Sequence, residues 1–101
     1  MRYLGRLHGA GVLICEGETF ARADYDFDGF LTKPGHVTGA GEIRATPEAL
    51  KEVFGRKGLQ LQTDDGRVLT LRFSEKRLRA ANDAASVDVV GDLPLAAEWR
   101  G

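Results

Sequence analysis

The sequence has few of the residues that form disulfide-rich or zinc-binding domains. It has one cysteine, Cys15, and two histidines, His8 and His36. A single cysteine cannot form an internal disulfide, which agrees with a reducing compartment. Neither histidine has a second ligand at zinc-site spacing, and Cys15 lies in an apolar run, where thiols are usually inert. We therefore expect no zinc site, no cofactor and a cytoplasmic location.

Long apolar runs and an excess of one charge are also absent. No run approaches the ~20 apolar residues that span a bilayer, and the first residues lack the pattern of a signal peptide. The formal net charge is −1, so no global field attracts nucleic acid or an anionic membrane. We expect no membrane partner, and any contact with nucleic acid must come from a local patch.

The composition is that of an ordinary globular protein. Of 101 residues, 43% are hydrophobic and 29% are charged, which suffices for one core. We expect a single domain over residues 1–101, with a loosely ordered tail from about residue 95. The predicted fold class is mainly β (α+β). We expect about six or seven largely antiparallel strands in a small barrel-like or two-layer sheet, with one short helix at about residues 47–55.

Two hairpins can be predicted from the alternation of apolar and polar residues. Residues 11–15 and 19–23 are expected to pair across a turn at 16–18. In the second hairpin, a two-residue turn would place apolar side chains opposite polar ones. A three-residue loop, Asp64–Gly66, instead pairs Leu61 with Leu69, Leu59 with Leu71 and Gln60 with Thr70. A further strand is expected at residues 86–90.

The expected helix has recognisable start signals. Thr46 can cap it, and Pro47 suits the first helical position because its missing N–H is no loss there. Leu50, Val53 and Phe54 then form an apolar stripe that should pack on the sheet.

A short glycine-rich pattern, G-x-[LV]-x-G-A-G-x-[LI], occurs at residues 5–13 and again at 35–43. Glycines at alternate positions leave one strand face bare, which permits a sharp bend or the close approach of a neighbouring element. The alternative is a phosphate-binding loop. We favour the structural interpretation, because neither copy matches a known phosphate-binding pattern and no long helix follows either one.

The segment ADYDFDGF, residues 23–30, has two interpretations. Asp24, Asp26 and Asp28 followed by glycine match the start of a calcium-binding loop, but the twelfth position, normally glutamate, is Gly35. In a strand the same carboxylates project to one side about 6.6–6.8 Å apart, too far to share one ion. We favour a strand with its aromatic residues in the core, and the three aspartates remain the metal-ligand candidates.

Two further binding candidates come from the C-terminal third. Residues 72–79 are locally basic and adjoin an aromatic residue, Phe73, so they could hold a single strand of nucleic acid; the alternative is a solvated sheet edge. Trp99 either folds back onto the domain or is an exposed contact. The basic candidates are Arg72, Lys76, Arg77 and Arg79.

No catalytic constellation stands out. Asp24, Asp26, Glu42 and Asp88 could meet in space, but nothing selects a pair, so we lean against an enzyme. The leading hypothesis is a non-catalytic binding or assembly module whose partner is a protein, including another copy of itself. The alternative is a carrier of a small apolar ligand. Its cavity would be lined by Leu7, Leu13, Tyr25, Phe27, Leu69 and Leu71.

Overall fold

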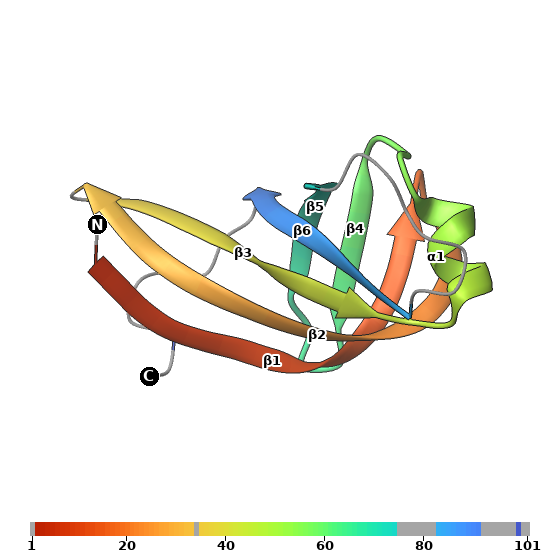
Figure 1. The fold of residues 1–101 in the computed structure, drawn as a ribbon, viewed down its shortest axis with the longest axis horizontal. Helices are drawn as coiled ribbons and strands as arrows, with labels where there is room; N and C mark the ends of the chain where they lie inside the picture. The colour runs from red at the N-terminus through yellow and green to blue at the C-terminus, as the bar shows by residue number, and fades with distance from the viewer. Residues whose placement is uncertain (1, 34, 75–82, 92–98, 100–101) are drawn as a thin grey trace.

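The computed structural model describes residues 2–33, 35–74, 83–91 and 99. Its elements are β1 (Arg2–Cys15), β2 (Glu18–Lys33), β3 (His36–Arg44), α1 (Pro47–Val53), β4 (Leu59–Thr63), β5 (Val68–Phe73) and β6 (Ala84–Gly91) (Figure 1). The six strands of this part of the chain form a closed barrel in the order β1-β2-β3-β6-β5-β4, and every pairing is antiparallel. The predicted mainly β, barrel-like class is confirmed.

The barrel consists of two three-stranded meanders. The first is β1-β2-β3 and the second is β4-β5-β6, with α1 between them in the sequence and against one end of the barrel (Figure 1). Two seams join the meanders, β3 to β6 and β1 to β4. Consecutive strands pair within each meander, whereas each seam pairs two strands that are far apart in the chain.

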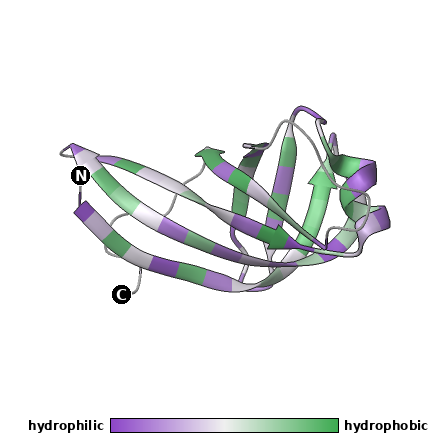
Figure 2. Cartoon of the chain, viewed as in Figure 1, coloured by the Kyte–Doolittle hydropathy of each residue, from purple (hydrophilic) through white to green (hydrophobic). Residues whose placement is uncertain are grey.

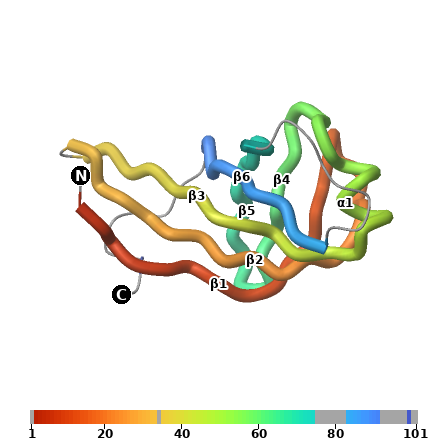
Figure 3. The backbone as a smooth tube through the Cα atoms, in the orientation of Figure 1, coloured from red at the N-terminus to blue at the C-terminus, as the bar shows by residue number. Residues whose placement is uncertain are grey.

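The strands close the barrel over only part of their length. β4 pairs with β1 at Gly11–Cys15, and β6 pairs with β3 at Gly39–Arg44. Beyond these residues the first meander continues as a long, curved three-stranded sheet (Figures 1 and 3). At Arg2–Gly9, the edge of β1 that faces away from β2 pairs with no strand among the residues that the structure describes.

Both predicted hairpins form. Leu61 pairs with Leu69 and Gln60 with Thr70 around the three-residue loop, where Gly66 has the positive φ (96°) that this loop type requires. In the first hairpin the turn is one residue shorter than predicted. Glu16 and Gly17, with φ of 52° and 80°, form its two central positions, and Glu18 already pairs with Cys15. Two successive positive φ angles are typical of the tight turns that match strand twist.

The helix begins as predicted but ends earlier. The Thr46 side chain accepts a hydrogen bond from the Ala49 N–H at 3.2 Å. The helix stops at Val53 rather than residue 55, because Phe54 is extended and Gly55 has φ of 79°. Val53 is buried as expected, whereas Phe54 is half-buried, with its ring centroid 4.9 Å from that of Phe73.

Hydropathy alternates along the strands (Figure 2), and the buried residues of the strands form one hydrophobic core cluster. Residues proposed to line a ligand cavity contribute instead to one packed cluster: Leu13, Tyr25, Phe27, Leu69 and Leu71 are buried in it, and Leu7 packs against it half-buried. The strand predicted at residues 86–90 is present as β6.

A row of glycines crosses the first meander. Gly5 of β1 pairs with Gly29 of β2, and Gly29 pairs with Gly39 of β3. The indole of Trp99 lies over this row: a Cβ built on Gly29 would lie 2.6 Å from Trp99 Cε2. Trp99 is 5% exposed, so of the two alternatives left open for it, the one in which it folds back onto the domain agrees with the structure. The other residues of the predicted tail lie outside the described part of the chain.

The glycine-rich repeat has the structural role predicted for it. Gly11 and Gly41 occupy the same place in the two copies, and both lie where a neighbouring strand passes close by. A Cβ on Gly11 would lie 3.0 Å from the Thr63 Cα, and one on Gly41 would lie 2.8 Å from the Phe27 Cα. Only glycine permits these approaches without a shift of backbone.

Candidate functional site

The three aspartates of the ADYDFDGF segment lie along the outer face of β2. Tyr25 and Phe27, which alternate with them, are 5% and 0% exposed. The strand interpretation is therefore confirmed: the aromatic side is dry, and the acidic side faces solvent.

Two of these carboxylates bind groups from β1. Arg6 forms a bidentate ion pair with Asp26, with N–O distances of 2.6 and 3.0 Å, and the Tyr3 hydroxyl donates to Asp28 Oδ1 at 2.8 Å. The hydrogen bond from Arg6 lowers the pKa of Asp26, and the hydrogen bond to Asp28 raises the pKa of Tyr3. Across the described residues, no three His, Cys, Asp or Glu side chains gather as a metal site would require.

The outer face around Asp26 is charged and shallowly hollowed, with a volume of about 440 Å³. His8, Asp26 and Glu42 form one row across β1, β2 and β3. Asp26 and Glu42 are like charges on opposite strands, which is unfavourable alone. Arg6 compensates Asp26, and Arg44 lies 2.8 Å from Glu42. These ion pairs explain how the acidic face is tolerated and single out no acid–base pair.

The edge of β1 beside this face presents main-chain groups outward. The Asp64 N–H donates to the Ala10 carbonyl at 2.9 Å, so this carbonyl points away from β2. In an antiparallel strand, alternate residues direct their N–H and C=O to the same edge. The pairing of β1 with β2 is regular from Gly5 to Leu13, so Arg6 and His8 direct their main-chain groups to that same open edge.

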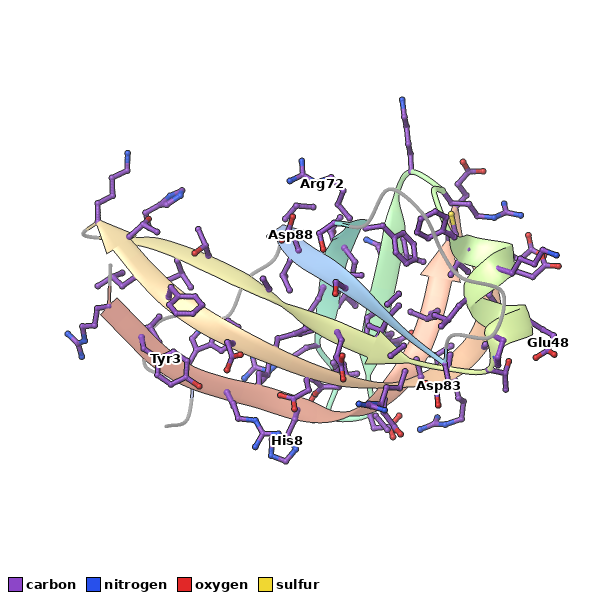
Figure 4. All side chains as sticks on the ribbon, in the orientation of Figure 1. Tyr3, His8, Glu48, Arg72, Asp83 and Asp88 are labelled. Atoms are coloured by element: carbon purple, nitrogen blue, oxygen red, sulfur yellow. The ribbon has the colours of Figure 1, made fainter. Side chains whose placement is uncertain are left out.

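The side chains along this edge alternate in character. Arg6 and His8 are exposed, whereas Leu7 is half-buried against the core. Figure 4 shows Tyr3 and His8 projecting outward from β1. The sequence alone does not locate this open edge, because the length over which β4 pairs with β1 is a property of the tertiary structure.

A second hollow, of about 540 Å³, lies between the segment after α1 and the ends of β5 and β6; we call it the helix-end groove. It brings together Arg72, a sequence candidate, with Arg56 and Lys57, which the sequence did not single out. Arg72 is exposed and lies 3.4 Å from Asp88 (Figure 4). The described residues that line the helix-end groove are Phe54, Gly55, Arg56, Lys57, Gly58, Thr70, Leu71, Arg72, Phe73 and Val90. Lys76, Arg77 and Arg79 lie outside the described residues.

No family model, curated protein or solved structure matches the chain. No helix in the described segments is long and apolar enough to cross a membrane.

Proposed function

We propose that the protein is a non-catalytic binding or assembly module that accepts an extended strand of a partner protein along the open edge of β1. The observation that supports this is the direction of the main-chain groups of Arg6 and His8, on an edge where no described strand pairs. A strand added there gains main-chain hydrogen bonds, and its alternate side chains provide selectivity.

The flanking side chains specify the kind of strand. An incoming residue on the inner face meets Leu7, which is half-buried, and its neighbours on the outer face meet Arg6 and His8. An apolar residue fits beside Leu7. Acidic residues fit beside Arg6 and His8, since cross-strand pairs of opposite charge are favourable. A second copy of the chain is the simplest partner to test. We also propose a cytoplasmic location, on the basis of the single cysteine.

The decisive variant is His8→Pro. It removes an N–H that faces the open edge and spares the hydrogen bonds to β2, because the His8 main chain points away from that strand. Proline is tolerated at such edge positions. The matched control, His8→Thr, keeps the N–H. Thermal melts should show that both variants fold.

The test has two readouts. Sedimentation of the wild-type chain over a concentration range detects self-association, and selection from a displayed library of extended peptides detects other partners. We expect association by either route to be lost in His8→Pro and kept in His8→Thr. A wild-type chain that is monomeric throughout and selects no peptide, or binding that His8→Pro leaves intact, would refute the proposal.

The ligand-carrier and enzyme alternatives have less support. The residues expected to line a carrier's cavity belong to the core, and the acids on the outer face are compensated by arginines. For nucleic acid, only Arg72 of the four basic candidates is described, and it is beside Asp88.

A further inference from the structure

The helix-end groove is a second surface, separate from the β1 edge, and an inference about it does not depend on the proposed strand partner. Part of its lining is apolar. Phe54 and Phe73 pack together on one side, and Val90, 48% exposed, lies among the lining residues. An exposed valine beside two half-buried rings offers an aliphatic ligand apolar surface that otherwise faces water.

The charged side chains among the described lining residues of the groove all have one sign. Arg56, Lys57 and Arg72 contribute to it, and no aspartate or glutamate is among its described lining residues. Arg72 lies 3.4 Å from Asp88, and the arginine side chain is 71% exposed. Such a long, solvent-exposed ion pair contributes little to stability, so a ligand carboxylate can compete for the guanidinium.

The loop that carries two of these cations is anchored. The Arg56 Nε donates to the Glu52 carbonyl at 2.6 Å, and its guanidinium lies 4.8 Å from the centre of the Phe20 ring. The Cys15 thiol donates to the Lys57 carbonyl at 3.4 Å. Because these contacts fix the loop, binding there orders little that is not already ordered.

We propose that the helix-end groove binds a small amphipathic carboxylate, with its apolar chain on Phe54, Phe73 and Val90 and its head group at the cations. A volume of about 540 Å³ is in the range of small-molecule sites. Nucleic acid fits less well. Its bases stack on open aromatic faces, whereas Phe54 and Phe73 pack on each other, 4.9 Å apart.

The test is calorimetric titration of the full chain with decanoate, with decanol and an oligothymidylate as comparison probes. We expect decanoate to bind with one-to-one stoichiometry and more tightly than decanol. A Lys57→Gln/Arg72→Gln double variant should bind decanoate several-fold more weakly, and added salt should also weaken binding.

Val90→Asp places a carboxylate in the groove at an exposed position. Its matched control is Val68→Asp, because Val68 is also an exposed valine of the sheet, at 40%, and does not line the groove. We expect on the order of a tenfold loss of decanoate affinity in Val90→Asp, about 1.4 kcal/mol, and no loss in the control. No decanoate binding, equal effects of the two variants, or preferential binding of the oligothymidylate would each overturn the proposal.

Discussion

At the scale of single residues, charged side chains on the outer face of β2 are paired with side chains close to them in space. Arg6 pairs with Asp26, the Tyr3 hydroxyl donates to Asp28, and Arg22 lies 2.7 Å from Asp64 in the loop between β4 and β5. Each partner comes from a segment distant in the sequence. The row of acids therefore costs the fold little, because cations and donors from other strands surround it.

The pair of Arg6 and Asp26 makes a testable contribution to pH dependence. Because the pKa of Asp26 is lowered in the folded protein, the pair stabilises the fold at pH values above the ordinary aspartate pKa of 3.8. This stability is lost as pH falls through the lower, folded pKa. The amount is small, since both side chains are about half exposed, at 52% and 46%.

In Arg6→Gln we expect the Asp26 pKa to rise toward its ordinary value, as followed by NMR titration of the side-chain carboxyl. Arg22→Gln is the control, because Arg22 lies on the same face but pairs with Asp64. An Asp26 pKa that is unchanged in Arg6→Gln would contradict this assignment.

The residue pattern predicted which side of β2 is dry, since alternation in a strand is local. It could not predict that Arg6 reaches Asp26, because that requires the register of β1 on β2. Nor could it identify the helix-end groove, where Lys57 and Arg72 come from separate elements.

At the scale of elements, glycines determine how the strands curve past one another. Gly41 is the sharpest case, because its missing side chain lies against the main chain of β2, at Asp26 and Phe27. Backbone cannot give way as the end of a flexible side chain can. Gly41→Ala should therefore separate β3 from β2 or shift their register.

We expect Gly41→Ala to lower the free energy of unfolding by roughly 1–3 kcal/mol, the usual range for overpacking, as measured by urea denaturation. Gly91→Ala is the control. Among the described residues, its Cβ would lie 3.3 Å from the Thr70 Cβ, a tight contact but a much milder one than that of Gly41 with the main chain of β2. Equal stability of the two variants would show that β2 and β3 tolerate the added methyl group.

Elements could be predicted from the sequence where their turns and caps depend on neighbouring residues alone. The three-residue loop ending at Gly66 follows from matching the faces of β4 and β5, and Thr46 and Pro47 mark the start of α1. The register shifts between β1 and β2 were not predictable, because such bulges depend on the curvature of the whole sheet.

At the scale of the whole molecule, Trp99, the last described residue, packs against β2. It lies over Gly29 and is 5% exposed. We expect Trp99→Ala to cost about 3–5 kcal/mol of unfolding free energy, typical of a buried tryptophan.

Tyr3→Ala is the control for this prediction, since Tyr3 is 51% exposed and should cost much less in the same urea titration. The native fluorescence of Trp99 should also resist quenching by iodide. A small stability loss together with efficient quenching would mean that the indole leaves the glycine row in solution. Sequence could not settle this position, because the row forms only when three strands align Gly5, Gly29 and Gly39.

The division of the barrel into two meanders has a consequence for how the chain reaches its native state. Within each meander, strands that are consecutive in the sequence can pair early, because closing the short loops between them costs little entropy. The seams must wait, since β1 meets β4 only after two strands and the helix have been synthesised and ordered between them. We therefore expect ring closure to be the slow kinetic phase, with the two halves collapsing first as separate nuclei.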